Sequence, residues 1–188
     1  MNLSLLILLP TLTAVAILFC KGLKQVRVIA LTGAAVQMVV AGILLFAYWS
    51  ERATGNTAQM LFQSGYTWFA PLHIEYFVGV DGISVAMILL TAFVVLAGVL
   101  VSWRMETLSK EFFFLLILLS AGAYGFFISL DLFTMFFFLE VAVIPKFMLI
   151  GVWGSGKKEY SAMKLALMLM SGSALVFVVV GKTGPAAM

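Results

Sequence analysis

Residues 132–153 read LFTMFFFLEVAVIPKFMLIGVW, a run in which only Glu140 and Lys146 carry a charge. An α-helix needs about 20 predominantly apolar residues to cross the hydrocarbon core of a bilayer, so this stretch predicts a transmembrane helix. The whole chain has the same character. Of its 188 residues, 64% are hydrophobic and 10% are charged, against about 45–50% and 25% in soluble domains. A soluble fold of this size could not bury so much apolar surface.

Five further stretches resemble this one in length and apolarity, so we predict an all-α polytopic membrane helix bundle of about six transmembrane helices in a single domain. The six spans are residues 3–19, 28–49, 82–103, 112–130, 132–153 and 160–180. Trp49, Trp103 and Trp153 fall at predicted helix ends, where an amphipathic ring prefers the headgroup level. The first span lacks the basic flank and the cleavage site of a signal peptide, so we expect it to be a membrane helix.

The loop between the second and third spans is the only sizeable segment predicted outside the membrane. Leu72–Tyr76 alternate apolar and polar residues, the period of a half-buried strand. With Tyr66–Phe69 and the Ala70-Pro71 turn before them, they predict a short extracytoplasmic β-hairpin. His73 is expected to be a surface strand residue rather than a ligand.

The positive charges predict the orientation in the membrane. Loops on one side carry Lys21, Lys24, Arg27, Arg104, Lys110, Lys157 and Lys158, and the other side carries Arg52 and Lys182. Because cytoplasmic loops are enriched in Lys and Arg, the larger group predicts the cytoplasmic side and an extracytoplasmic N-terminus. The basic residues are scattered between apolar runs, which favours membrane flanks over nucleic-acid binding.

Several kinds of site are excluded or disfavoured. One cysteine, Cys20, and one histidine cannot build a disulfide framework, an iron–sulfur cluster or a zinc site from this chain alone. Residues 151–157 imitate the phosphate-binding pattern G-x-x-x-x-G-K, but Lys158 stands where Ser or Thr should follow. We therefore predict no metal, nucleotide or cofactor site. Asp81 and Asp131 precede apolar runs and are predicted helix N-caps.

Three ionisable side chains lie inside predicted spans: Glu140 and Lys146 on the fifth and Lys164 on the sixth. A charge at the centre of a span costs about 2.5–3.5 kcal/mol on insertion scales, so such residues indicate function. At 1.5 Å rise per residue, Glu140 lies about 4 Å from the middle of its helix and Lys164 about 10 Å from the middle of its own. Lys146 lies at an intermediate depth. Both lysines could instead extend their ammonium groups to the headgroups or form ordinary ion pairs.

Glu140 is the strongest candidate for chemistry, as a proton relay. Hydrocarbon favours the neutral carboxyl and a nearby ammonium favours the charged one, so a group balanced between them can load and release a proton. The alternative is a protonated carboxyl that only joins helices by hydrogen bonds. Pro145 removes the hydrogen bond to the carbonyl of Val141 and should kink the helix. Freed carbonyls are tolerated only beside protein or water, which predicts that Glu140 faces the bundle interior.

Residues 131–154 resemble the fifth helix of subunit M, the antiporter-like membrane subunit of NADH–quinone oxidoreductase (complex I). Residues 79–84 (GVDGIS) are similar to the opening of the third helix, and Tyr160–Lys164 followed by Ser171–Ser173 resemble the start of the sixth. The resemblance runs in order over nearly the whole chain. Two residues depart from the pattern: Leu139, where many members have an aromatic residue, and Lys146, where many have Met.

The resemblance implies an N-terminal part of a proton-translocating subunit of about fourteen helices in a bacterial inner membrane. In the family the fifth-helix glutamate, here Glu140, pairs with a lysine on a broken seventh helix, which this chain lacks. The resemblance also implies that Lys164 corresponds to a lysine on the sixth helix of the family. No redox centre is expected on this chain; NADH, FMN, iron–sulfur clusters and quinone are expected on partner subunits. Other membrane subunits and lipid are the expected partners.

Two other functions stay open. A subunit of a multisubunit sodium/proton antiporter would share these helices and this glutamate. A structural or assembly membrane protein would tolerate apolar replacement of Glu140 with no change in transport.

Overall fold

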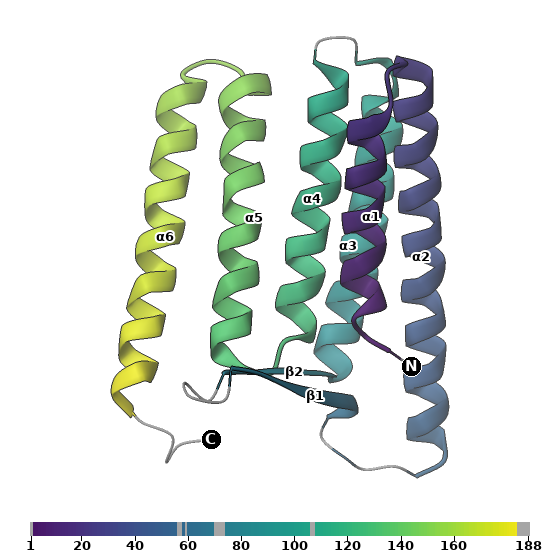
Figure 1. Cartoon of the computed structure of the whole chain (residues 1–188), viewed down its shortest axis with the longest axis vertical. Helices are drawn as coiled ribbons and strands as arrows, with labels where there is room; N and C mark the ends of the chain where they lie inside the picture. The colour runs from purple at the N-terminus through teal and green to yellow at the C-terminus, as the bar shows by residue number, and fades with distance from the viewer. Residues whose placement is uncertain (1, 56–57, 59, 70–73, 106–107, 184–188) are drawn as a thin grey trace.

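The computed structural model describes residues 2–55, 58, 60–69, 74–105 and 108–183. These residues form six α-helices and a two-stranded antiparallel sheet (Figure 1). The helices are α1 (Leu5–Phe19), α2 (Leu23–Ala53), α3 (Gly82–Val101), α4 (Ser109–Ile128), α5 (Leu132–Trp153) and α6 (Lys158–Thr183), and the strands are β1 (Leu61–Phe69) and β2 (Ile74–Val80). A 3-10 turn, Ser102–Arg104, follows α3. The prediction of a membrane helix bundle with a small β-hairpin is confirmed.

The helices follow the predicted spans closely, with one clear difference. Helix α2 extends beyond the predicted 28–49 at both ends. Residues such as Lys24 and Arg52 are good helix formers, so the helix continues beyond the ends of the apolar stretch. Within the described part of the chain, α2, α3 with its 3-10 turn, α4 and α5 are each long and apolar enough to cross a membrane, and α1 is a shorter apolar helix.

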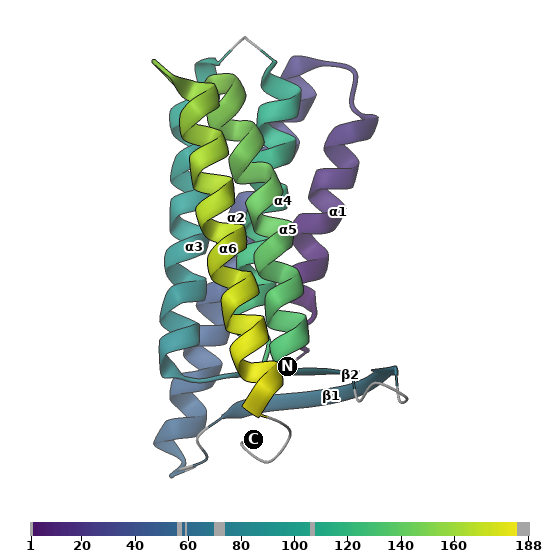
Figure 2. The same cartoon turned by 90° about the vertical axis from the view of Figure 1, so that its left-hand side faces the viewer.

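Helix α4 is the centre of the bundle. It contacts α1, α2, α3 and α5, whereas α6 packs chiefly on α5. Figures 1 and 2 show α5 and α6 extending from α4 on the side away from α2. The seven basic residues lie at or just before the starts of α2, α4 and α6 and in the 3-10 turn after α3, all at one end of the bundle, and the hairpin crosses the other end (Figure 1). The two faces of the bundle therefore differ in charge as the sequence predicts.

The hairpin is fixed to the junction between α4 and α5. Tyr66 pairs with Tyr76 in its register, and the Leu130 amide donates to the Phe77 carbonyl at 2.8 Å. A bridge also joins Val78 to Ser129. Both strands are longer than the sequence predicted, and the predicted turn and His73 lie outside the described residues. The contacts of β2 couple the hairpin to the start of α5, the helix that carries Glu140.

Both predicted N-caps are confirmed. The Ser84 amide donates to Asp81 Oδ1 at 2.7 Å, and the Thr134 amide donates to Asp131 Oδ2 at 3.0 Å. These bonds satisfy amides that have no partner inside the helix. The hydrogen bonds from Ser84 also hold the pKa of Asp81 below its ordinary value. Asp131 thereby fixes the start of α5, about two turns before Glu140.

A proline in α1 creates a polar contact in the core. Pro10 has no amide hydrogen, so the carbonyl of Leu6 loses its helical donor. Gln37 of α2 replaces that donor: its Nε2 lies 3.0 Å from the Leu6 oxygen, and its side chain is only 4% exposed. An unpartnered carbonyl at this depth would cost free energy that water cannot restore. This bond joins α1 to α2 and was not predicted from the sequence.

We predict that Gln37→Met destabilises the protein by about 1–3 kcal/mol, because it leaves the Leu6 carbonyl buried without a donor. Pro10→Ala restores a backbone amide to that carbonyl, so the same Gln37→Met change should cost clearly less in the Pro10→Ala background. Thermal unfolding of the four proteins in detergent measures the coupling. Equal losses in both backgrounds would contradict the contact.

Candidate functional site

The Glu140 carboxylate meets a serine of the neighbouring helix. Ser173 Oγ on α6 donates to Glu140 Oε1 at 2.6 Å. Glu140 is half-buried and Ser173 is buried, with 6% of its surface exposed. A short bond from a hydroxyl to a carboxylate is among the strong hydrogen bonds of proteins. Glu140 therefore faces α6 inside the bundle.

The same serine has a second acceptor, the carbonyl of Met170, at 3.0 Å. A hydroxyl carries one proton and two lone pairs, so it can donate to the charged carboxylate or accept from the protonated one. In the second case the Ser173 proton is free to turn to the Met170 carbonyl. Ser173 can thus satisfy Glu140 in either protonation state without moving a helix.

Close packing of α4 against α5 supports the position of Glu140. A Cβ added at Gly122 would lie 2.9 Å from the Ala142 Cβ and 3.0 Å from the Ala142 amide nitrogen. Only glycine permits this approach of the two backbones. Ala142, Val143 and Pro145 are buried, which confirms that this part of α5 faces the interior. Helix α5 stays continuous through Pro145.

Lys146 lies elsewhere on α5. It is half-buried and lines a cavity of about 430 Å³ between α3, α4 and α5, together with Thr91 and Ser120. Residues six apart on a helix differ by about 120° in direction. Among the described residues, Lys146 forms no ion pair with Glu140. The structure does not bring these two candidates together.

Lys164 is also separated from Glu140. It is exposed and lines a hollow on the outer surface of α6 with Tyr160 and Leu167. Nine residues separate it from Ser173, which corresponds to about 180° around an ideal helix. Ser173 therefore faces α5 while Lys164 faces away from it.

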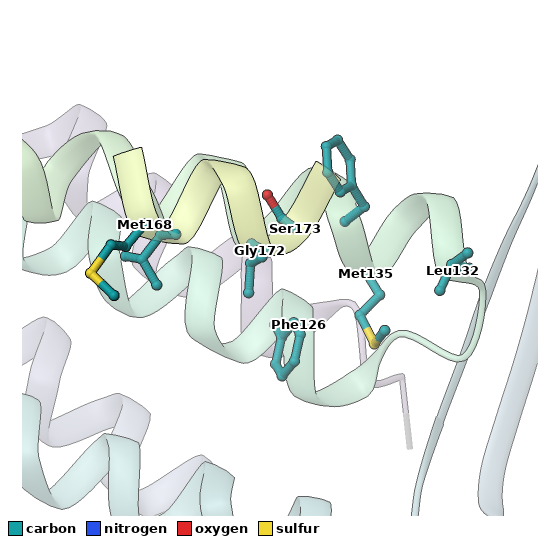
Figure 3. Close-up of a pocket in the computed structure, with 9 residues that line it drawn as sticks. Phe126, Leu132, Met135, Met168, Gly172 and Ser173 are labelled. Carbon is teal, nitrogen blue, oxygen red and sulfur yellow. The ribbon is translucent and has the colours of Figure 1, made fainter. Parts of the chain in front are cut away.

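A second cavity, of about 410 Å³, lies where α4, α5 and α6 meet. Ser173 carries the only hydroxyl group in its lining; the other lining residues are Phe126, Leu132, Met135, Phe136, Leu139, Met168, Leu169 and Gly172. Figure 3 shows Ser173 and Gly172 side by side on α6, with Phe126 and Met135 across the cavity. The serine thus borders an apolar cavity and contacts the carboxylate. Across the described ranges, no three His, Cys, Asp or Glu side chains gather as a metal site would require.

Comparisons with known proteins find a family match that includes α5 and most of α6, and relatives that match most of the chain. Residues 129–181 match the family described as "NADH:quinone oxidoreductase/Mrp antiporter, TM". The chain is 32% identical to "NAD(P)H-quinone oxidoreductase chain 4 2" of Picosynechococcus over 94% of this chain and 33% of that protein. It is 34% identical to "NADH-quinone oxidoreductase subunit M" of Rhodobacter capsulatus over 82% and 29% of the two chains.

Residues 129–181 thus match the NADH:quinone oxidoreductase/Mrp antiporter family, and nearly the whole chain is similar to proteins named as chain 4 or subunit M. It spans about a third of the length of the curated relatives that it matches. "F(420)H(2) dehydrogenase subunit M" of Methanosarcina mazei is a further relative, 32% identical over 86% of this chain and 32% of that protein. A solved archaeal respiratory complex, the membrane-bound sulfane sulfur reductase, contains a chain with the same fold: the TM-score is 0.70 at 21% identity, over 94% of this chain and 35% of that one.

Glu140, Lys146, Lys164 and Ser173 all lie within the segment that matches the antiporter family. The sequence predicted a role for the first three, whereas Ser173 entered only through the resemblance of Ser171–Ser173 to the sixth helix of the family. The signal it could have used is small: Ser173 is a hydroxyl residue in a predicted span next to the one that carries Glu140. Helix α6 is largely apolar, so its sequence did not indicate which face packs against α5.

We predict that Gly122→Ala pushes α5 away from α4 and destabilises the chain by about 1–3 kcal/mol, the usual cost of overpacking. Gly42→Ala is the matched control, because a Cβ at Gly42 meets nothing within 4 Å and alanine is the better helix former. Thermal unfolding in detergent compares them. Equal stability of the two variants would contradict the close approach of α4 and α5.

Proposed function

We propose that this chain is part of subunit M of NADH–quinone oxidoreductase, a membrane subunit that translocates protons. Support comes from the relatives named as subunit M or chain 4 and from the family match over α5 and α6. NADH, FMN, iron–sulfur clusters and quinone would then be bound by partner subunits. Redox energy would reach this chain through neighbouring membrane subunits, and the chain would be the N-terminal part of a subunit of about fourteen helices.

One observation carries the proposal: the bond between Glu140 and Ser173. A proton carrier inside a bilayer must be stable enough in both protonation states to be loaded and emptied. The Ser173 hydroxyl donates to the charged carboxylate. When Glu140 is protonated, the carboxyl donates to Ser173 Oγ, and Ser173 donates to the Met170 carbonyl. Neither state leaves a polar group of this pair without a partner in hydrocarbon, where each such group costs several kcal/mol.

The lysines have different proposed roles. Lys146 lines a cavity between α3, α4 and α5, so its proposed role is to influence the electric field along α5 from there. Lys164 is exposed on α6, where it is available to another helix or subunit, in keeping with its match to a family lysine. The seven basic residues at one end of the bundle favour a cytoplasmic location for that end, so protons would leave on the side of the hairpin and the N-terminus. Moving one proton against 100 mV costs about 2.3 kcal/mol.

A relative whose complex is named for a different electron donor is informative. The F(420)H(2) dehydrogenase subunit M is as similar to this chain as the NAD(P)H-quinone oxidoreductase chain 4 is. A membrane subunit that does not touch the electron donor explains this similarity. The proposed role is therefore proton transfer and not recognition of NADH.

In the intact complex, Glu140→Gln is expected to preserve assembly and to lower the number of protons pumped per NADH, because the amide cannot carry a proton between states. Ser173→Ala should also lower the number of protons pumped per NADH, because it removes the hydrogen-bond partner of Glu140. Ser171→Ala is the matched control, since within the described part of the chain Ser171 Oγ bonds only the Leu167 carbonyl of its own helix. The ratio is measured in membrane vesicles as acidification against NADH oxidation.

Unchanged proton stoichiometry in Glu140→Gln would contradict the relay and favour a structural role. The family description also includes Mrp antiporters, which makes a sodium/proton antiporter subunit the second candidate. Proton movement that needs sodium and proceeds without NADH oxidation would favour that candidate.

A further inference from the structure

Lys146 places a positive charge inside the bundle without a counter-charge. It is half-buried on α5, and among the described residues it forms neither an ion pair nor a hydrogen bond. Ionisable groups inside membrane proteins almost always pair with one another or with backbone carbonyls. The Lys146 ammonium therefore requires a partner.

The cavity of about 430 Å³ beside Lys146 does not supply that partner. No Asp or Glu is among the described residues that line it. It contains two hydroxyl groups, and both donate their protons within their own helices. Thr91 Oγ1 donates to the Met87 carbonyl at 2.8 Å, and Ser120 Oγ donates to the Ile117 carbonyl at 2.6 Å. The counter-charge therefore has to enter the cavity from outside this part of the chain.

The cavity is open on the side of the bundle. Leu90 and Val94 of α3, which form one wall, are 55% and 57% exposed. Along α4 the lining runs from Leu116 to Phe127, about 16 Å or three helical turns. Ala123 lies between them, and small residues let helix backbones approach closely in membranes. The space has the length and the open side that a packed transmembrane helix needs.

The depth of Lys146 decides whether a lipid or a protein supplies the counter-charge. Lys146 lies seven residues, about 10 Å, before the end of α5 at Trp153, and a tryptophan at a helix end marks the headgroup level. The cavity continues from Lys146 away from that end, past Ala142 to Leu139. A lipid phosphate stays outside the hydrocarbon core, whereas a carboxylate on a transmembrane helix can lie at any depth. Charge and depth together favour a protein partner.

We propose that the cavity between α3, α4 and α5 receives a transmembrane helix of a neighbouring membrane subunit, and that an Asp or Glu of this helix pairs with Lys146. A buried polar pair can fix which helix packs and in which register. Similar proteins are named as a subunit and as part of a respiratory membrane complex. The proposal rests on the proposed function for one point alone, that this chain works beside other membrane subunits. It does not involve Glu140, which faces α6.

The hydrophobic reagent dicyclohexylcarbodiimide tests this pair in the intact complex in its membrane. It converts a carboxyl group in hydrocarbon to an O-acylisourea. The Lys146 amine attacks the acyl carbon, an amide bond forms, and dicyclohexylurea leaves with one carboxyl oxygen and two protons, one from each partner. Mass spectrometry after digestion is expected to find Lys146 joined to an Asp or Glu in a transmembrane helix of another subunit.

Two variants separate the charge of Lys146 from its bulk. Lys146→Met should abolish the amide and release the neighbouring subunit several-fold more readily as detergent is added, because the carboxylate loses its partner. Lys146→Arg keeps the charge and should retain the subunit as the unaltered complex does. Native electrophoresis measures the retained fraction.

An amide to another segment of the same polypeptide would overturn the proposal. So would the absence of an amide at Lys146 in membranes where other carboxyl groups react, which is the result expected if lipid covers the cavity. Equal subunit retention in Lys146→Met and the unaltered complex would also contradict it. The amide forms without turnover, so this test can fail while Glu140→Gln still lowers proton pumping, and the reverse.

Discussion

The scarcity of water around this chain is the constraint on which the rest depends. A polar group inside hydrocarbon has no solvent to bond, so each one must find a partner in the protein. The Leu6 carbonyl, freed by Pro10, is bonded by Gln37. Glu140 is bonded by Ser173 of the next helix. The polar contacts of the bundle therefore determine which helices meet, more than the apolar surfaces that all helices share.

Small residues set how close these partners come. Gly122 brings the backbones of α4 and α5 together near Glu140, and the cap at Asp131 fixes where α5 begins. The hairpin adds a third restraint, because Leu130 is bonded to β2 just before that cap. The proposed relay at Glu140 needs such a rigid support, because Ser173 must stay within hydrogen-bonding distance in both protonation states. Lys146 and Lys164 point to other faces of their helices.

Much of the fold could be predicted from the sequence, because apolar length and charge position are strong signals in membrane proteins. The spans follow from these two signals. The hairpin follows from the alternation of apolar and polar residues, the two caps from an aspartate before each apolar run, and the inward position of Glu140 from Pro145. The partners of the polar groups could not be predicted, since they depend on how each helix is rotated about its axis. In helices as apolar as α6, no polar stripe defines that rotation. One signal was available: Gln37 is the only amide side chain well inside a predicted span, and Pro10 leaves a carbonyl in need of a donor.

The central claim is that Glu140 changes its protonation during turnover while Ser173 bonds both forms. Infrared difference spectroscopy of the intact complex, started by NADH, measures this directly through the carbonyl stretch of a protonated carboxyl group. The account predicts a band that rises and falls with turnover, is absent in Glu140→Gln, and shifts in frequency in Ser173→Ala but not in Ser171→Ala. A difference spectrum that is identical in the unaltered complex and in Glu140→Gln would contradict it.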